Sequence, residues 1–326
     1  MIRKTSNRIN GSGLFPAMEK PAYIYTFTSH ETELELCRME LRALFGRDPD
    51  GADWLESDTR IDPDRSPFVT ACVEVIAAES SIERLAERAA GIPLNDGTFK
   101  VIALQAGNHH SYEELRAMER IVGGSMKGRA DMKTPEHRFG LLSVQGGWKL
   151  GLLHLPSRAW HQHKQKPQNY STGLTSRLAR ALVNIAAPDP SAKLLDPCCG
   201  MGNVLIEALS MGIRCEGCDI NPLAVRGARV NLAHYGYDDS IVAIRDMNTL
   251  EGHFETAVLD LPYNVCSVFP EEDQRRMLNS LRRLADRAVI VSTVPLAEQL
   301  EQAGWQVLSS CTTRKGTFVR SIWLCE

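Results

Sequence analysis

One stretch, residues 194–207 (LLDPCCGMGNVLIE), constrains the fold more than any other part of the chain. A short apolar run ends at Asp196, a turn of small residues carries Gly200 and Gly202, and Asn203 opens an amphipathic run. The pattern predicts a strand, a tight glycine turn and a helix. Glycines let a ligand approach the backbone closely, and a helix N-terminus offers free N–H groups and a positive dipole end. The stretch therefore predicts an α/β sheet with a nucleotide-type ligand at this turn.

Two motifs downstream of the glycine turn limit which kinds of ligand the turn can bind. Alone, a strand, a Gly-x-Gly turn and a helix are shared by proteins that bind NAD, FAD or S-adenosylmethionine. Here Gly217-Cys-Asp219 ends the second predicted strand, where one carboxylate can accept both hydroxyl groups of a ribose. Asp260-Leu-Pro-Tyr263 then follows the fourth predicted strand. The order and spacing of the three motifs therefore discriminate among these ligands, whereas the glycines alone do not.

This ordered set resembles the S-adenosylmethionine-dependent methyltransferases that modify exocyclic amines of nucleic-acid bases. The resemblance implies the class I methyltransferase fold, a Rossmann-like α/β sheet of about seven strands, and the alternating elements after residue 169 agree with it. Strands over 305–312 and 317–324 would form its antiparallel end. The tetrad Asp-Leu-Pro-Tyr is most similar to tRNA guanine-N2-methyltransferases that act on guanosine 10, which also carry an N-terminal THUMP-type module.

The resemblance implies a binding site for S-adenosylmethionine at the ends of successive strands. A loop closes over the methionine end, the glycine turn holds the cofactor, the second strand end holds the ribose, and the third strand end contacts the adenine. The matching residues are Tyr170, Ser171 and Thr172 in the loop; Asp196, Cys198, Gly200, Gly202 and Asn203 at the turn; Asp219 and Ile220 at the second strand; Asp246 and Met247 at the third; and Asp260.

The tetrad supplies the catalytic residues that this resemblance implies. Asp260, helped by a backbone carbonyl near Leu261, would accept the hydrogens of the amine and aim its lone pair at the cofactor methyl. Pro262 rigidifies the turn and leaves no competing N–H, and Tyr263 offers a ring to stack an extruded base. The family commonly has glycine after the aromatic residue, whereas this chain has Asn264, so the resemblance does not fix the target base or its position.

Three functions remain open at this point. The first is methylation of the N2 amine of a guanosine in tRNA. The second is the same chemistry on another amine, such as N2 of guanine or N6 of adenine in rRNA or DNA. The third is a non-catalytic RNA-binding protein with a relic cofactor fold, against which the intact Asp260 and Tyr263 argue.

Residues 21–156 predict a separate α+β module. Strands over 22–28, 68–77 and 100–106 alternate with helices over 31–45, 81–90 and 111–122, a pattern that resembles a ferredoxin-like domain. The stretch 131–155 ends in a hairpin with a glycine turn and resembles the end of a THUMP domain, which binds tRNA near its acceptor end. The resemblance implies phosphate contacts, and with the basic linker the candidates are Lys127, Arg129, Lys133, Arg138, Lys164 and Lys166.

Composition bounds the class and the compartment. The chain has 326 residues, enough for two domains, and a net charge of -3, so it is not a globally basic nucleic-acid binder. The stretch 120–166 is locally basic, with 9 Lys or Arg residues against 2 Asp or Glu residues. The sequence shows no signal peptide and no apolar run of ~18 residues, which indicates a cytoplasmic enzyme with reduced thiols and no membrane contact.

The remaining segments complete the predicted domain organisation. Residues 1–20 are expected to be a disordered leader, 157–168 a polar interdomain linker, and 169–326 the methyltransferase domain. In the linker, His161 and His163 are expected to be surface residues. Cys215 and Cys218 are expected to be buried strand thiols. No metal site is predicted, because neither pair has a further ligand pair nearby.

Overall fold

The computed structural model describes residues 22–170, 173–262, 270–315 and 318–326. They group into two compact units. Unit 1 contains residues 22–27, Pro49–Pro63 and Val69–Pro156, and unit 2 contains Thr28–Asp48, Asp64–Phe68 and Ser157–Glu326. The stretch expected to form one N-terminal module, 21–156, is thus shared between the units, and the expected linker 157–168 groups with unit 2.

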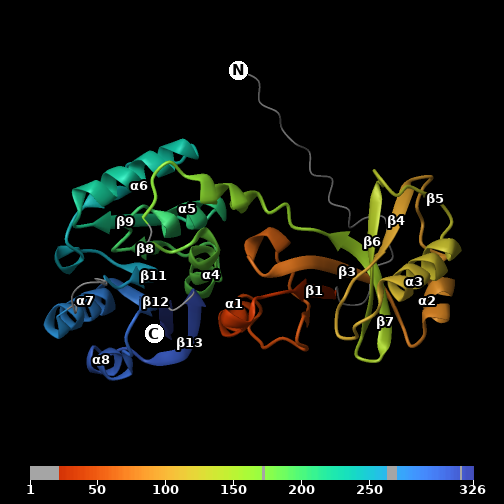
Figure 1. Cartoon of the computed structure of the whole chain (residues 1–326), viewed down its shortest axis with the longest axis horizontal. Coiled ribbons are helices and arrows are strands. Elements are labelled where there is room, and N and C mark those ends of the chain that lie inside the picture. The colour runs from red at the N-terminus through yellow and green to blue at the C-terminus, as the bar shows by residue number, and fades with distance from the viewer. Residues whose placement is uncertain (1–21, 171–172, 263–269, 316–317) are drawn as a thin grey trace, which may run out of the picture. The chain divides into compact units, whose positions relative to one another are not determined.

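Unit 1 is an α+β unit built on one mixed sheet (Figure 1). Its strands lie in the order β2-β1-β3-β7-β6-β4-β5, with β4 parallel to both β5 and β6 and the other neighbours antiparallel. Its elements are β1 (Tyr23–Phe27), β2 (Trp54–Ser57), β3 (Val69–Glu79), α2 (Ile82–Ala89), β4 (Thr98–Ala103), α3 (Tyr112–Ser125), β5 (Arg129–Ala130), β6 (His137–Val144) and β7 (Gly147–His154).

Alternation along β4 explains which face of this sheet the helices cover. Phe99 and Val101 lie in a buried cluster with Leu85 of α2 and Val122 of α3. Lys100, between them in the strand, therefore points to the opposite face. Each helix starts at a serine whose side chain accepts a backbone N–H of the first turn. The helices cover one face, and the basic side chain of Lys100 belongs to the other.

Unit 2 contains a second seven-stranded sheet in the order β10-β9-β8-β11-β12-β14-β13. Neighbours from β10 to β12 are parallel, and β14 is antiparallel to both β12 and β13. This is the predicted class I methyltransferase fold, antiparallel end included. Its strands are β8 (Leu194–Asp196), β9 (Cys215–Asp219), β10 (Val242–Ile244), β11 (Phe254–Asp260), β12 (Ala285–Ser292), β13 (Val307–Lys315) and β14 (Phe318–Cys325).

The helices of unit 2 follow the strands in the order that the sequence predicts. Helix α6 begins at Pro222 because the side chain of Asn221 caps it and proline suits the first turn of a helix. The α-helices are α1 (Leu34–Phe45), α4 (Ser176–Ala186), α5 (Asn203–Ser210), α6 (Pro222–His234), α7 (Glu271–Leu284) and α8 (Ala297–Gln302). Short 3-10 turns are η2 (Glu31–Glu33), η3 (Pro63–Arg65), η4 (Ala159–Gln165) and η5 (Met247–Thr249).

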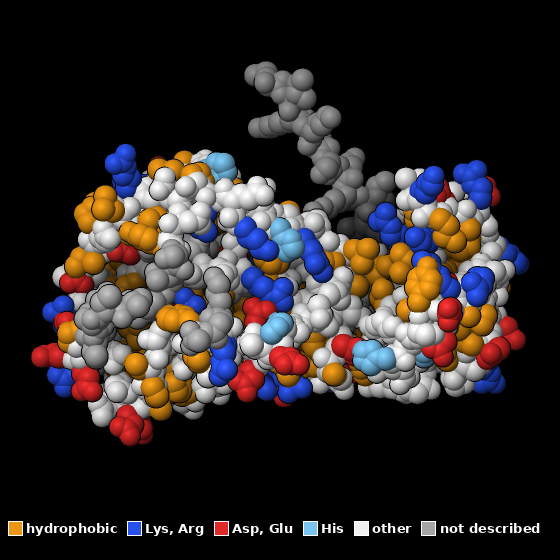
Figure 2. Space-filling model, in the orientation of Figure 1, with side chains coloured by type: hydrophobic (Ala, Val, Ile, Leu, Met, Phe, Trp, Pro, Cys, Tyr) orange, Lys and Arg blue, Asp and Glu red, His pale blue; other side chains and the backbone are white. Residues whose placement is uncertain are grey.

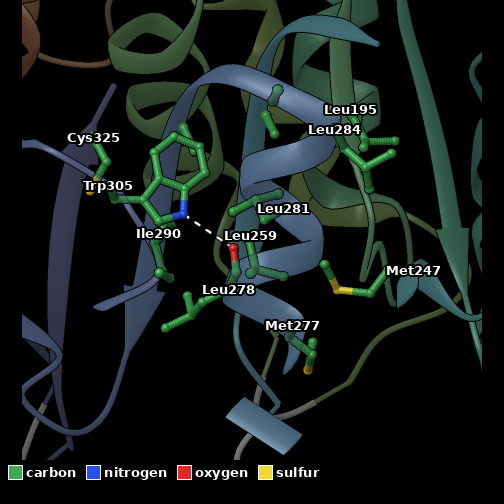
Figure 3. Close-up of a cluster of buried hydrophobic side chains, with 14 of the residues drawn as sticks. Leu195, Met247, Leu259, Met277, Leu278, Leu281, Leu284, Ile290, Trp305 and Cys325 are labelled. Carbon is green, nitrogen blue, oxygen red and sulfur yellow. Dashed lines mark hydrogen bonds between the residues drawn. The ribbon is translucent and has the colours of Figure 1, made fainter. Parts of the chain in front are cut away.

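The two faces of the β11 strand carry different neighbours. Ala257 and Leu259 lie in an apolar cluster with residues of α7. Figure 3 shows this cluster, with Met247 and Trp305 among its members. In that cluster the indole N–H of Trp305 donates to the carbonyl of Leu278 at 3.2 Å. Thr256, one position earlier, faces the other way, and its hydroxyl donates to the carbonyl of Ala186 at the end of α4. The sheet is therefore covered on both faces, as a parallel sheet requires.

Two segments expected to be irregular have structure. Trp54–Ser57 forms β2 between the predicted helix 31–45 and the predicted strand 68–77, because Trp54 and Leu55 are buried. In the expected linker, Trp160 and His163 are buried and the segment forms η4. The polar sequence around each apolar anchor concealed both elements. In the part of the chain that the structure describes, no helix combines the length and apolarity needed to cross a membrane.

Candidate cofactor and catalytic site

The glycine turn lies at the carboxyl end of β8, as the sequence predicts. Gly200 and Gly202 have φ angles of 51° and 78°, in the left-handed region that glycine adopts without strain. Asp219, at the end of the adjacent β9, fixes the turn: its Oδ2 accepts the N–H of Gly200 at 2.9 Å and its Oδ1 accepts the N–H of Asn221 at 2.8 Å. The Nδ2 of Asn203 donates to the carbonyl of Leu174 at 2.9 Å and so joins the turn to the segment before α4.

Three carboxylates stand at the ends of three adjacent parallel strands: Asp196 on β8, Asp219 on β9 and Asp260 on β11. Burial, with the charges of the other two aspartates, raises the pKa of Asp196 well above its ordinary value. Burial also raises the pKa of Asp260 to about 7, an effect that Arg320 opposes. Oδ1 of Asp260 is buried and has no hydrogen-bond partner among the described residues. An unpartnered buried carboxylate oxygen is costly, so it marks a candidate functional group.

Two adjoining hollows open along this edge of the sheet, and Cys198, Asp260 and Pro262 line both. The larger has a volume of about 450 Å³ and the smaller about 190 Å³. The larger is also lined by Pro197, Asp219, Ile220, Arg245, Asp246, Met247, Asn248, Asp273, Arg276 and Met277. The smaller is also lined by Tyr170, Gly173, Leu174, Asp196, Cys199, Gly200, Met201, Asn203, Val204 and Leu261.

The residues predicted to contact the adenine, Asp246 and Met247, line the larger hollow, and hydrogen bonds hold the carboxylate of Asp246 in place. Asp246 uses Oδ1 to accept two bonds from Asn248, from the backbone N–H at 2.9 Å and from Nδ2 at 2.8 Å. Met247 is 3% exposed and lines the hollow from the apolar core, whereas Ile220 is 71% exposed. Of the other predicted residues, Tyr170 lines the smaller hollow. Ser171, Thr172 and Tyr263 lie outside the described residues.

The donor set fits S-adenosylmethionine, which carries cationic sulfonium and amino groups and a ribose with two hydroxyls. Asp196, Asp219 and Asp260 line the hollows, and one oxygen of Asp260 is buried and unpartnered within the described part of the chain. Asp219 already accepts two backbone bonds, but its two oxygens can accept more. The turn residues and the smaller hollow would hold the amino-acid end, and Asp219, Ile220, Asp246 and Met247 would hold the adenosine.

The predicted phosphate contacts divide between the two units. Lys127, Arg129, Lys133 and Arg138 are exposed in unit 1, where Figure 2 shows basic side chains gathered among apolar ones. Lys164 is exposed in unit 2. Lys166 does not fit the prediction: it is 8% exposed, and burial lowers the pKa of its ammonium group, an effect that Glu207 opposes. A buried ammonium is not available to a phosphate, so Lys166 is removed from the candidates.

The structure also reveals a buried polar cluster in unit 2 that the sequence did not predict. The guanidinium of Arg180 donates to Glu207 at 2.7 Å, and Glu207 contacts Nδ1 of His163 at 2.8 Å. The expectation of a surface position for His163 was therefore wrong, because this pairing holds the imidazole inside. Arg180 and Asn184 stand four residues apart within the stretch 178–186 of α4, whose other residues are all apolar, and this spacing is a sequence signal that could have revealed the cluster.

Unit 2 thus combines the class I methyltransferase fold with carboxylates and a glycine turn at the carboxyl ends of its parallel strands. Residues 163–304 match the UPF0020 family model, described as an RMKL-like methyltransferase domain. This part of the chain is therefore similar to the methyltransferase domain that the family model describes. The finding agrees with the fold and with the resemblance carried by Asp196, Asp219 and Asp260.

Curated relatives extend the comparison. The chain is 36% identical over 203 residues to a tRNA (guanine(10)-N2)-dimethyltransferase of Methanothermobacter thermautotrophicus, covering 58% of this chain and 60% of the relative. It is 29% identical over 185 residues to the protein of that name from Pyrococcus abyssi, covering 52% and 55%. A mouse protein named U6 snRNA (guanine-N(2))-methyltransferase THUMPD2 is 27% identical over 185 residues, covering 52% and 33%. The matches thus span no more than 60% of the length of these relatives.

Among solved structures, TrmN from Thermus thermophilus superposes on 94% of this chain and 99% of that chain. The TM-score is 0.49 and the sequence identity is 19%. These values are too low to support an inference about function. The assignment of the fold rests on the strand order of unit 2, and the similarity to a methyltransferase domain rests on the match of residues 163–304 to the family model.

Proposed function

We propose that this protein transfers a methyl group from S-adenosylmethionine to the exocyclic N2 amine of a guanosine in tRNA, with guanosine 10 as the target. One observation carries the proposal: Asp260 presents a buried carboxylate oxygen, unpartnered among the described residues, where the two hollows meet. The relatives named for guanine-N2 methylation of tRNA support the choice of amine and of nucleic acid.

The geometry of the β11 end accounts for how the chain would prepare the amine. S-adenosylmethionine, when bound, supplies an electrophilic methyl group. Asp260 accepts hydrogens of the amine, which draws the nitrogen lone pair out of conjugation with the base and fixes its direction. The N–H of Leu261 donates to the carbonyl of Val291 at 3.0 Å, and Pro262 has no N–H. The turn is thus tied to the neighbouring strand, and neither residue offers a free backbone N–H that competes for the carboxylate.

The ionised form of Asp260 is the one that accepts two amine hydrogens. Because burial raises the pKa of this carboxyl to about 7, turnover is expected to increase as the pH rises through that value. Arg320, which is buried on β14, acts in the opposite direction to burial and favours the carboxylate. Burial therefore favours the protonated form of Asp260, and the charge of Arg320 favours the ionised form that the reaction needs.

Unit 1 is proposed as the THUMP-like RNA-binding module. Arg138 stands in register beside Lys100 on neighbouring parallel strands, and Arg129 stands beside Thr98, so the three basic side chains leave the same face of the sheet. Like charges placed side by side repel, and phosphate groups relieve that repulsion. Lys127 and Lys133 flank β5 and are exposed. Such contacts would supply affinity and register and would leave the choice of base to the hollow at Asp260.

Mass spectrometry of nucleosides in total tRNA from a strain that lacks the gene tests the proposal. N2-methylated guanosine at position 10 should be lost and should return with the wild-type gene. It should not return with an Asp260→Asn gene, which keeps the fold and removes the carboxylate. Unchanged N2-methylguanosine would contradict the proposal, and loss of N6-methyladenosine in its place would assign the same chemistry to adenine.

A further inference from the structure

We infer that Asn231 is a positioning residue of the proposed cofactor site. Its side-chain amide fixes the distance between the glycine turn and the segment that precedes α4, the two walls of the smaller hollow. The inference rests on the proposed function, because it gives Asn231 a role in binding the amino-acid end of S-adenosylmethionine. Asn231 lies outside the motifs that identify the site and lines neither hollow.

The hydrogen bonds of Asn231 join two distant stretches of chain. Its Oδ1 accepts the N–H of Gln168 at 2.8 Å. Its Nδ2 donates to the carbonyl of Gln168 and to the carbonyl of Met201, both at 2.9 Å. The residue is fully buried at 0% exposure, and both hydrogens of the amide are used. A single side chain therefore holds both backbone groups of Gln168 and one backbone group of the glycine turn.

The packing of α6 shows that the turn is seated on this helix. A Cβ on Gly227 would lie 2.2 Å from the sulfur of Met201, and a Cβ on Gly202 would lie 3.3 Å from the Cβ of Ala228. Gly227 and Asn231 are four residues apart, so they share a face of α6. At Gly227 the absence of a side chain leaves room for the side chain of Met201. One turn later, the amide of Asn231 donates to the carbonyl of Met201.

The residues that Asn231 holds, Gln168 and Met201, lie next to or within the two walls of the smaller hollow. Tyr170, which lines the hollow, follows Gln168 by two residues. On the other side, Met201 lies between the two glycines of the turn. Asn203 and Leu174 also line the hollow, and the bond from Asn203 Nδ2 to the carbonyl of Leu174, at 2.9 Å, joins the same two walls a second time. Displacing the amide of Asn231 would therefore move the walls apart, whereas Asp219 and Asp246 of the larger hollow make no direct hydrogen bond to it.

Calorimetric titration of the full-length protein with two ligands tests this assignment. S-adenosylhomocysteine has the adenosine and the amino-acid tail, and 5′-methylthioadenosine has the adenosine without that tail. Asn231→Asp replaces the two donors of the amide with an oxygen that faces two carbonyls. The affinity for S-adenosylhomocysteine should fall about tenfold or more, whereas the affinity for 5′-methylthioadenosine should stay within about twofold.

Asn184→Asp is the matched control. Asn184 is also 0% exposed, and its Nδ2 donates to Glu40 at 2.6 Å and to the carbonyl of Arg65 at 2.8 Å, but it lines neither hollow. Both variants should lower the thermal stability, and Asn231→Asp alone should separate the two ligands. Should Asn231→Asp fail to fold, Asn231→Ser, which removes the bridge without adding a charge, is titrated in its place with the same expectation.

The outcomes separate the inference from the proposed function. An equal loss of affinity for both ligands in the Asn231 variant, or an equal selective loss in the Asn184 variant, would overturn the positioning role and leave the proposed function standing. Unchanged affinity for S-adenosylhomocysteine in the Asn231 variant would overturn it as well. A wild-type protein that binds neither ligand would overturn the proposed function, and the role of Asn231 would fall with it.

Discussion

Unit 2 contains two buried carboxyl groups whose pKa values are raised to about 7, Asp260 and Glu40, and they have opposite surroundings. Oε2 of Glu40 accepts the hydroxyl of Ser66 at 2.5 Å and Oε1 accepts Nδ2 of Asn184 at 2.6 Å. Asp260 has an oxygen without a partner in the described part of the chain and borders two hollows. Burial raises both pKa values, so a raised pKa alone does not mark an active site. The unused acceptor beside a cavity is the additional feature that makes Asp260 the candidate catalytic residue.

The cluster around Glu40 joins segments of unit 2 that lie far apart in the sequence. Arg180 donates to the carbonyls of Asp64 and Arg65 at 2.7 and 3.1 Å, and to Glu207 at 2.7 Å. These bonds tie the segment Asp64–Phe68 to α4 and α5. A methyltransferase unit cut at residue 169 would keep the pair of Arg180 and Glu207 but would remove the backbone acceptors of Arg180 at Asp64 and Arg65 and the imidazole of His163 beside Glu207. The N-terminal segments therefore belong to the folding unit of the proposed enzyme.

The largest expected effect concerns Asp260. Asp260→Asn keeps the shape of the side chain and removes the charge that accepts amine hydrogens, so turnover should fall at least about a hundredfold. The affinity for S-adenosylhomocysteine should change less than about threefold, because the carboxylate acts on the amine. Turnover with labelled S-adenosylmethionine and calorimetric titration measure the two quantities. Equal losses of both would show that Asp260 holds the cofactor.

The next effect belongs to the Glu40 cluster. Arg180→Met removes one partner of a buried ion pair, and the free energy of unfolding should fall by about 3–5 kcal/mol. The control is Arg42→Met, which breaks an exposed pair with Asp48 at 2.5 Å and should cost no more than about 1 kcal/mol. Urea denaturation followed by circular dichroism measures both. Similar midpoints for the two variants would mean that the buried cluster does not stabilise unit 2.

A smaller effect is expected at the ribose site. Asp219→Asn keeps an acceptor for one backbone N–H and loses the charge that holds the ribose hydroxyls. The affinity for S-adenosylhomocysteine should fall about ten- to a hundredfold. The affinity for 5′-methylthioadenosine should fall by a similar factor, since both ligands carry the ribose. An unchanged affinity for either ligand would remove Asp219 from the cofactor site.

The smallest effect is a change in the pH dependence of stability. A carboxyl whose pKa is raised in the folded state stays protonated between pH 4 and 7, where the unfolded chain ionises, so the folded state loses stability as the pH rises through this window. Asp260→Asn and Glu40→Gln each remove one such group. Relative to wild type, each variant should gain on the order of 2 kcal/mol between pH 5.5 and pH 7.5. Parallel curves for variant and wild type, from urea unfolding without ligand, would contradict the raised pKa.

The sequence predicted the fold of unit 2 well because its elements carry local signals. Turn glycines, helix caps and apolar runs that end in aspartate located β8, β9 and β11 and the helices between them. The same signals gave the positions of Asp196, Asp219 and Asp260 at one edge of the sheet. Short-range chemistry decides these features, so a single sequence contains them.

Other features depend on partners far apart in the chain. The grouping of 28–48 and 64–68 with unit 2 follows from bonds such as that of Arg65 to Asn184, which join residues 119 positions apart. His163 and Lys166 were misplaced because a polar sequence around Trp160 concealed a buried segment. Asn231 was missed because its partners, Gln168 and Met201, are far from it in the sequence and come close only in the folded chain.

One measurement tests the central claim most directly. Purified wild-type protein and the Asp260→Asn variant are incubated with tRNA from the strain that lacks the gene and with S-adenosylmethionine labelled in its methyl group. Mass spectrometry of the digested tRNA should find the label in N2-methylguanosine at position 10 with the wild-type protein and not with the variant. Label in another nucleoside, or equal labelling by both proteins, would contradict the account.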